Sequence, residues 1–386
     1  MAGNGAHGMT AATMRTTQRI MAIAVSGAAL ISCSTDSRTH IASVAPVPAY
    51  HVDIPVPPPA PKPVAKAPEA LIANVAALGR SFDGRVGIAV RSIDAGWMVE
   101  SNGAMRLPQQ SVSKLWVAMT VLDFRDSGRL RLDDAVTLTR DDVTLFHQPI
   151  AALIKDDGYQ TTIGELLQRA LTTSDNTAND RLLRYVGGPS TVRSFIQRKG
   201  LGDIRFGPGE RLLQSQTAGL DWRPEYAFGN AFTRARALLP RSDRIAAFER
   251  YVTDPPDGAA PVAIAGALAK LKRGEILSKS STDYLIGTME SSKTGKQRLR
   301  GAVPPGWSFG HKTGTGQDLA GRTAGYNDVG LLMAPDGRSY ALAVMIGDTP
   351  RPIADRQQLM QAVVSAIVNN HGGGAPYYLP GRAPDQ

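Results

Sequence analysis

Apolar and polar residues follow two different periods along residues 69–371 of this 386-residue chain. Near the start, the apolar positions between residues 71 and 78 recur every three or four residues, a spacing that predicts one face of a helix. The apolar run 85–90 then predicts a strand. Two more apolar runs, 328–334 and 340–346, lie near the other end. Strands are therefore expected at both ends of this stretch.

The two late runs flank Pro335-Asp-Gly-Arg338, a combination typical of a turn between paired strands. A helix is predicted after them, because residues 359–368 carry apolar side chains at helical spacing. The middle of the chain has mostly helical periodicity. This layout predicts an α+β fold, in which one antiparallel sheet takes its strands from both termini and packs against a helical body.

One segment of the middle region is apolar on every side except for a single lysine. Residues 111–122 contain Lys114, and a helix that is apolar all round is buried inside a protein. A buried lysine costs several kcal/mol unless it is paired or neutral. Ser111 lies on the same helical face, at about 5–6 Å between Cβ atoms. Because such a lysine can accept the hydroxyl proton, Ser111 and Lys114 are a candidate nucleophile and base.

The N-terminal region predicts export rather than a folded core. Residues 20–32 form a 13-residue apolar run after basic residues, which is typical of a signal peptide and short for a membrane span. Cys33 is the only cysteine and ends the sequence LISC, which resembles a bacterial lipobox. We expect cleavage before Cys33 and acylation of its thiol. The alternative is an ordinary secretory signal with an incidental cysteine, and translation starts at either Met1 or Met14.

Four regions are expected along the chain. They are a lipoprotein-type signal peptide (1–32), a proline-rich tether (33–68), a catalytic domain (69–371) and a flexible tail (372–386). Nine prolines between residues 46 and 68 favour an extended chain that packs no core. The expected protein is exported to the periplasm, held at a membrane by its lipid, and monomeric.

Composition narrows the function classes. The hydrophobic content of 42% and charged content of 20% are ordinary for a globular protein. The net charge is +9, but the longest basic run is KLKR at 270–273 and no nucleic-acid motif is present, so nucleic acid is not an expected partner. The six histidines show no metal-ligand spacing. Neither a metal nor another cofactor is expected.

Two further motifs strengthen the interpretation of Ser111 and Lys114 as a nucleophile and base. Ser174-Asp-Asn176 follows an amphipathic run, and Lys312-Thr-Gly314 precedes the strand-rich end. Ser-x-x-Lys alone occurs often by chance, but Ser-x-x-Lys, Ser-Asp-Asn and Lys-Thr-Gly in this order are the motifs of class A β-lactamases and penicillin-binding proteins. The chain therefore resembles the class A β-lactamase family over most of residues 69–371. A second Lys-Thr-Gly, at 293–295, follows a helical run and predicts a helix end with a C-terminal glycine.

The resemblance implies a fold, an activity and residue roles. The family has an α/β sandwich with an all-helical half, and its members open the cyclic β-lactam amide through an acyl-enzyme. By resemblance, Ser111 is the nucleophile, Lys114 helps to transfer its proton, and Ser174 protonates the departing nitrogen. The substrate-binding residues implied by the resemblance are Asn176, Lys312, Thr313, Gly314 and Thr315. The backbone N–H groups of Ser111 and Thr315 are the donors that it implies for the oxyanion. His311 either tunes Lys312, contacts substrate or is structural.

The residue that activates water for deacylation is ambiguous. In the family it is a glutamate in a Trp-Glu-Pro-Glu-Leu-Asn context, and the best match here is DWRPEYAFGN at 221–230. Direct alignment puts Arg223 at this position, and arginine cannot act as a base. A register one residue longer makes Glu225 the base, with Asn230 as its partner. Asp180, where many members have Asn, is another departure in this part of the chain.

The two registers imply different functions. With a working base, the chain is a β-lactamase that acts on a small-molecule β-lactam. Without one, it is a D-alanyl peptidase or transpeptidase, or a slowly deacylating penicillin-binding protein. The Ser-Asp-Asn form of the second motif, its spacing from Ser111 and the predicted export favour the β-lactamase.

Overall fold

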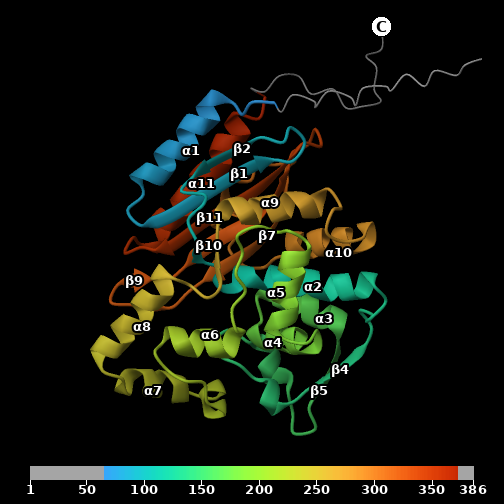
Figure 1. Cartoon of the computed structure of the whole chain (residues 1–386), viewed down its shortest axis with the longest axis vertical. Helices are drawn as coiled ribbons and strands as arrows, with labels where there is room; N and C mark the ends of the chain where they lie inside the picture. Colours follow the sequence, from blue (N-terminus) through green and yellow to red (C-terminus); the bar gives the residue numbers. More distant parts are fainter. Residues whose placement is uncertain (1–64, 373–386) are drawn as a thin grey trace, which may run out of the picture. The chain divides into compact units, whose positions relative to one another are not determined.

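The computed structural model describes residues 65–372, so the predicted signal peptide, Cys33, most of the tether and nearly all of the tail lie outside the described residues. An antiparallel five-stranded sheet has the strand order β2-β1-β11-β10-β7 (Figure 1). Its strands are β1 (Arg85–Ser92), β2 (Met98–Ser101), β7 (Ser308–Thr315), β10 (Tyr326–Met333) and β11 (Ser339–Asp348). Because β1 pairs with β11, both ends of the domain share one sheet, as predicted.

Helices cover both faces of this sheet (Figure 1). Helix α1 (Glu69–Ser81) and helix α11 (Ile353–Asn369) pack together on one face. Helix α9 (Pro261–Lys272) and helix α10 (Lys279–Glu290) cover the other face and adjoin the helical part of the molecule. The predicted helices at the two ends and the predicted hairpin of β10 and β11 are confirmed.

The strands supply apolar side chains to both faces of the sheet. In β11, Leu342, Val344 and Ile346 enter the core beneath α1 and α11, whereas Ala343 and Met345 enter the core of the helical part. Successive side chains of a strand point to opposite faces, so a continuous apolar run produces a sheet that is buried on both sides. The sheet is thus a rigid layer against which the site is built.

The middle of the chain forms the helical part, as predicted. Its central helix is α2 (Lys114–Asp126), in which every residue from 114 to 122 is buried. Its other helices are α3 (Ile163–Gln168), α4 (Asn176–Tyr185), α5 (Pro189–Arg198), α6 (Glu210–Thr217), α7 (Ala231–Leu238) and α8 (Arg241–Thr253). Short strand pairs are β3 (Leu107–Pro108) with β6 (Gly258–Ala259), β4 (Ala135–Leu138) with β5 (Tyr159–Thr162), and β8 (Asp318–Leu319) with β9 (Arg322–Thr323).

The helix predicted over 111–122 needs one change at its start. Gln110–Ser113 form a 3₁₀ turn, and the α-helix begins at Lys114. Gln110 has a φ of +53°, in the left-handed region that non-glycine residues rarely adopt. Ser111 therefore lies on a tight, strained turn directly before the helix.

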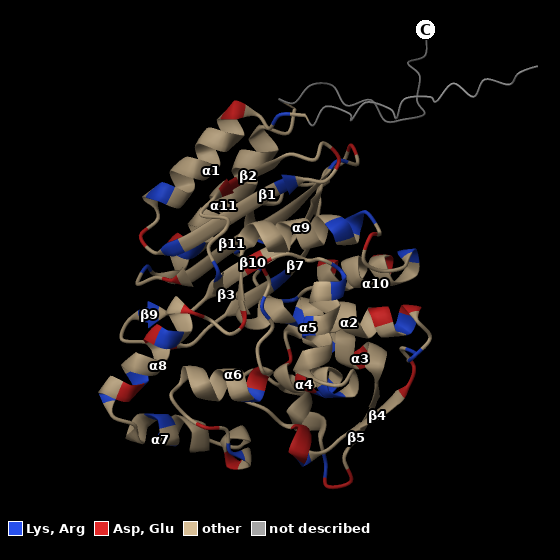
Figure 2. Cartoon of the chain, viewed as in Figure 1, with Lys and Arg blue, Asp and Glu red and all other residues tan. Residues whose placement is uncertain are grey.

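Basic and acidic residues are interspersed along the described part of the chain (Figure 2). Within residues 65–372, no helix is long and apolar enough to span a membrane. No group of His, Cys, Asp and Glu in the same region could hold a metal ion.

Candidate active site

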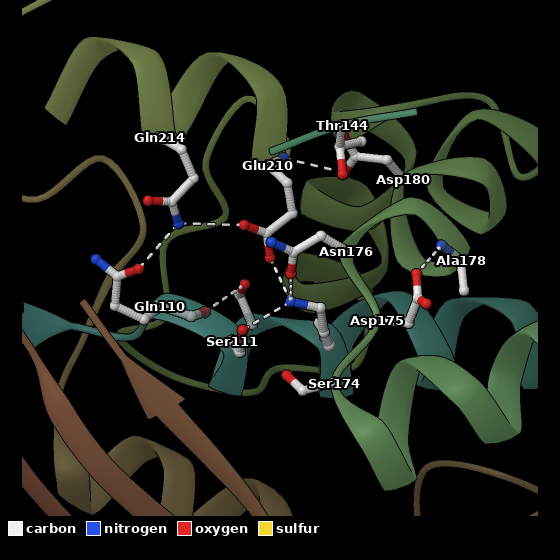
Figure 3. A network of polar contacts seen from close by, with 12 residues as sticks. Gln110, Ser111, Thr144, Ser174, Asp175, Asn176, Ala178, Asp180, Glu210 and Gln214 are labelled. Atoms are coloured by element: carbon white, nitrogen blue, oxygen red, sulfur yellow. Dashed lines mark hydrogen bonds and ion pairs between the residues drawn. The ribbon is translucent and has the colours of Figure 1, made fainter. Parts of the chain in front are cut away.

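The first motif forms a buried cluster around the ammonium group of Lys114. Lys114 is 1% exposed. Its Nζ donates to Ser111 Oγ at 2.7 Å and to Asn176 Oδ1 at 2.8 Å, and it pairs with the carboxylate of Glu210 (Figure 3). A buried cation is tolerable when charge and hydrogen bonds both compensate its desolvation. The predicted proximity of Ser111 and Lys114 is confirmed.

The second and third motifs meet each other close to this cluster. Lys312 Nζ, from β7, donates to Ser174 Oγ at 2.9 Å and to the carbonyl oxygen of Thr313 at 2.9 Å. Ser174 has a φ of +62° and links a π-helical turn (Arg169–Thr173) to α4. Burial, and then the nearby charge of Lys114, hold the pKa of Lys312 well below the usual value for lysine.

Strand β7 packs tightly against the turn that carries Ser111. A Cβ atom on Gly314 would lie 2.3 Å from the carbonyl oxygen of Gln109, so only glycine allows this approach. Beside it, Thr315 Oγ1 accepts a hydrogen bond from Arg298 Nη2 at 2.5 Å, and Arg298 Nη1 donates to the carbonyl oxygen of Gly314 at 2.8 Å. Arg298 is a buried cation that the sequence analysis missed.

These residues surround one cleft of about 380 Å³. Ser111, Ser174 and Asn176 line it from the helical part, and Thr313 and Thr315 line it from β7. The three predicted motifs are therefore brought to one cavity, although they are separated by 63 and 138 residues in sequence.

The second Lys-Thr-Gly motif also reaches the cleft. Helix α10 ends at Glu290, and Gly295 has a φ of +66° beyond it, so the motif follows a helix rather than lying on a strand. Thr294 Oγ1 lies 2.8 Å from Thr313 Oγ1, and both residues line the cleft. Lys293 is exposed. The segment thus supplies a wall of the cleft through its threonine.

The structure places a carboxylate beside Lys114 that the sequence analysis missed. Glu210 is the first residue of α6 and is 4% exposed. Its Oε2 accepts a hydrogen bond from Gln214 Nε2 at 3.2 Å, and Gln214 also donates to Gln110 Oε1 at 3.0 Å. Figure 3 shows Glu210 and Gln214 pointing from one helix toward the turn that carries Ser111. Glu210 therefore joins the nucleophile cluster.

Asp180 fixes the start of α6. Its Oδ1 accepts from the backbone N–H of Glu210 at 3.0 Å, and its Oδ2 accepts from the backbone N–H of Arg211 at 3.3 Å. Burial, and then the charge of Glu210, raise the pKa of Asp180. The departure from Asn at this position thus supplies two acceptors for the otherwise free N–H groups of the helix.

The one sequence feature that could have revealed Glu210 is its spacing. Glu210 and Gln214 are four residues apart, which places them on one helical face, and they follow two turn glycines in GPGERLLQ. This segment contains no tryptophan and no proline-glutamate pair, so it does not resemble the Trp-Glu-Pro-Glu-Leu-Asn context of the family.

Glu225 lies elsewhere, and the expectation that it would approach Ser111 is corrected. It belongs to the 3₁₀ helix Pro224–Ala227, its side chain is 59% exposed, and its carboxylate lies 4.0 Å from the guanidinium of Arg223. Neither residue lines the cleft. Trp222 packs edge-on against Tyr226, with ring centroids 6.4 Å apart. The resembling sequence therefore forms a surface turn.

His311 is buried and does not line the cleft. Its ring is fully buried, its Nδ1 lies 2.8 Å from Asp328 Oδ1, and Asp328 Oδ2 accepts from the backbone N–H of Leu299 at 3.1 Å. Since His311 does not line the cleft, the structural alternative fits its position best.

Comparison with known proteins agrees with this geometry. A family model described as "Beta-lactamase enzyme family" matches residues 68–371, so the chain belongs to that family. It is similar to the extended-spectrum β-lactamase PER-1 of Pseudomonas aeruginosa, with 29% identity over 283 residues, which are 73% of this chain and 80% of the relative. A β-lactamase of Bacteroides uniformis is 27% identical over 281 residues, 72% of this chain and 83% of the relative.

Solved structures show the same relationship. The crystal structure of a β-lactamase from Chitinophaga pinensis has a TM-score of 0.65 at 27% identity, covering 78% of this chain and 99% of that one. An ancestral class A β-lactamase has a TM-score of 0.60 at 28% identity, covering 78% of this chain and 99% of that one. The chain therefore has the fold of the class A serine β-lactamases and is an enzyme of this class, which hydrolyses the β-lactam amide.

Proposed function

We propose that this enzyme acylates Ser111 and uses Glu210, rather than Glu225, to activate the water that releases the product. The cluster around Lys114 supports this proposal, because it brings the hydroxyl of Ser111, the ammonium of Lys114 and the carboxylate of Glu210 into one hydrogen-bonded group. A general base must lie within hydrogen-bond reach of the proton that it takes, directly or through one water. Among the two candidate glutamates, Glu210 alone meets this condition.

Acylation follows from the positions of the first two motifs. Ser111 Oγ attacks the lactam carbonyl carbon while its proton passes to the Lys114–Glu210 pair. The carbon–nitrogen bond then breaks, and the departing nitrogen takes a proton from the hydroxyl of Ser174. Lys312, which donates to Ser174 Oγ, stabilises the oxygen as that proton leaves. The proton taken from Ser111 then passes from the Lys114–Glu210 pair to Ser174 Oγ, which restores the Ser174 hydroxyl and the carboxylate of Glu210 before deacylation. The backbone N–H groups of Ser111 and Thr315 receive the negative charge that develops on the carbonyl oxygen.

Deacylation uses the pair on α6. A water held between the carboxylate of Glu210 and the amide of Gln214 gives its proton to Glu210 and attacks the ester carbon. The ester bond to Ser111 Oγ breaks, and the serine regains its proton through Lys114. Asp180 supports this step, since it holds the backbone of Glu210.

Substrate binding follows the charges of the cleft. Lys312, with Thr313 and Thr315, holds the carboxylate of the β-lactam, because a cation with neighbouring hydroxyl donors suits that group. Arg298 adds a second positive charge through Thr315. Gly314 admits the close approach of β7, and Asn176 binds the side-chain amide of the substrate.

The test combines turnover with mass measurement. The purified protein is mixed with a chromogenic cephalosporin, and intact mass is taken at early and late times. Steady turnover with a transient adduct is expected, and Ser111→Ala is expected to abolish the adduct and lower kcat by more than about 10³-fold. A stoichiometric adduct that persists in the wild-type protein would overturn the assignment of Glu210 and identify a penicillin-binding protein.

We further propose that the chain is exported as a monomer and anchored through acylated Cys33. Support comes from the apolar run at 20–32, the lipobox-like LISC sequence and the prolines that follow it. The full chain is expressed in a Gram-negative bacterium, and its fractions are compared with those of Cys33→Ser and of the control Ser34→Ala. Only Cys33→Ser should move from the membrane to the soluble periplasmic fraction. Equal distribution of the three proteins would contradict the anchor.

A further inference from the structure

Helices α7 and α8 form a corner of the domain whose positive charge is left uncompensated by its own side chains (Figure 1). Residues 231–246, here called the α7–α8 corner, contain one acidic residue, Asp243, and four arginines. The arginines are Arg234, Arg236, Arg241 and Arg244. None of them forms an ion pair with any residue between 65 and 372. Figure 2 shows these basic positions on both helices.

Each helix of the corner also presents an apolar side chain to solvent beside an arginine. Leu238 of α7 is 85% exposed, the highest value for a large apolar side chain in the described part of the chain, and Ile245 of α8 is 37% exposed. Arg234 lies four residues before Leu238, and Arg241 lies four residues before Ile245. Residues at this spacing share a helical face. Since both arginines are exposed, each helix offers a cation and an apolar group side by side.

The other two arginines of the corner are partly buried and lie close to each other. Burial, and then the charge of Arg244, lower the pKa of Arg236. Arg236 Nη2 donates to the carbonyl oxygen of Asp318 at 3.1 Å, but the Nε atoms of Arg236 and Arg244 are buried without a hydrogen-bond partner among residues 65–372. Neighbouring cations repel each other, so an external anion would stabilise them. Phosphate suits guanidinium groups because its oxygens accept several N–H donors at once.

We propose that the α7–α8 corner is a docking surface for an anionic, phosphate-bearing membrane. Arginines beside exposed apolar side chains are typical of segments that bind at a membrane surface, where the cations meet lipid phosphates and the apolar groups enter the acyl boundary. A nucleic acid would occupy the arginines but leave Leu238 in water, so the apolar side chains favour the membrane. No residue of the corner lines the cleft, and the surface therefore acts beyond the β-lactam chemistry.

The test measures how the protein partitions onto lipid vesicles. The soluble Cys33→Ser protein is the background, so that no lipid on Cys33 contributes. Vesicles of phosphatidylcholine alone are compared with vesicles that also contain the anionic lipid phosphatidylglycerol. Co-sedimentation is expected with the anionic vesicles only, and it should weaken as sodium chloride is added, because salt screens exposed charges.

Variants of the corner should change this binding in both directions. The double variant Arg234→Gln/Arg241→Gln removes the two exposed cations and should weaken binding about 30-fold, or about fivefold for each arginine. Leu238→Ser should weaken it about tenfold, since less apolar surface is then removed from water. Asp243→Asn removes the one acidic side chain of the corner and should strengthen binding about fivefold.

The double variant Arg80→Gln/Lys155→Gln is the matched control, because it removes the same charge from two exposed positions outside the corner. It should bind within about twofold of the background protein, since charges beyond the Debye length contribute little. Equal weakening in this control would overturn the inference, because net charge alone would then explain binding. Equal binding of the background protein to both kinds of vesicle, or to neither, would also overturn it. Cephalosporin hydrolysis without vesicles should be unchanged in all these variants, which separates this result from the proposed function.

Discussion

Two glutamates of the helical part have opposite surroundings. Glu210 is 4% exposed and contacts Lys114 and Gln214. The side chain of Glu225 is 59% exposed, and its nearest cation is Arg223 at 4.0 Å. Glu225 has the more familiar neighbours in sequence, with a tryptophan and a proline before it, yet Glu210 has the neighbours in space that proton transfer requires. Hydrogen-bond reach therefore favours Glu210 over Glu225 as the proposed base, despite the local sequence context of Glu225.

The difference arises from how each segment is anchored. The first N–H groups of α6 are accepted by the buried carboxylate of Asp180, which fixes Glu210 at the start of the helix. The turn around Glu225 has no buried residue within Pro224–Ala227. A carboxylate on such a turn is solvated and free to move, so its ion pair contributes little.

The largest effect on the deacylation rate is expected when the carboxylates of Glu210 and Glu225 are replaced, one at a time, by amides. Glu210→Gln should lower the deacylation rate by about 10³-fold, since it removes a general base from the site. Glu225→Gln should stay within about twofold of wild type. Intact mass during turnover of a chromogenic cephalosporin checks this, because only Glu210→Gln should accumulate the Ser111 adduct. An adduct that accumulates in Glu225→Gln instead would reverse the comparison.

Removing the anchor of α6 should have the next largest effect. Asp180→Ala leaves two helix N–H groups without their acceptor, and loss of such a cap costs about 1 kcal/mol of stability. We expect kcat to fall by about tenfold or more, since Glu210 loses its fixed position. Asp221→Ala, at an exposed carboxylate near Glu225, is the control and should change neither kcat nor Tm. Wild-type kcat in Asp180→Ala would show that Glu210 is held by other contacts.

A pH effect should distinguish the two Lys-Thr-Gly segments. Because the pKa of Lys312 lies well below that of an ordinary lysine, its charge is lost as pH rises through this lowered value, and KM for an anionic β-lactam should rise with it. Lys312→Arg keeps its charge at all these pH values, so its KM should be flatter. Lys293→Arg should retain the wild-type KM profile. A flat wild-type profile up to the pH of ordinary lysine titration would contradict the prediction.

The smallest effect is expected on stability. Burial raises the pKa of Asp257 to about 7, where its carboxylate accepts the backbone N–H of Gln110. Since the folded protein binds this proton more tightly than the unfolded chain does, Asp257 should lower stability as pH rises from about 4 to about 7, by at most about 1.4 kcal/mol per pH unit. Urea unfolding should show a shallower decline for Asp257→Asn. A slope equal to that of the control Asp221→Asn would contradict this.

The sequence alone predicted much of the fold and the three motifs that meet at the cleft. Apolar periodicity predicted the end helices, the first strand and the β10–β11 hairpin. It is strong there because the apolar side chains of these elements are buried in the cores on the two faces of the sheet. Lys114 in an apolar helix pointed to Ser111, since a buried cation requires a partner. The Ser-Asp-Asn and Lys-Thr-Gly motifs follow Ser111 in the family's order, and this order assigned Ser174 and Lys312 to the same site.

Only the tertiary structure shows which side chains from separate segments contact one another at the site. Glu210 and Arg298 come from segments without a recognised motif. Glu210 pairs with Lys114, which is distant in sequence, and Arg298 bonds to Thr315 on β7. Burial and hydrogen bonding set the role of a titratable side chain, and both depend on which segments fold together. Sequence can therefore indicate that a base or a cation is needed, whereas only the packed chain shows which residues lie close enough to supply it.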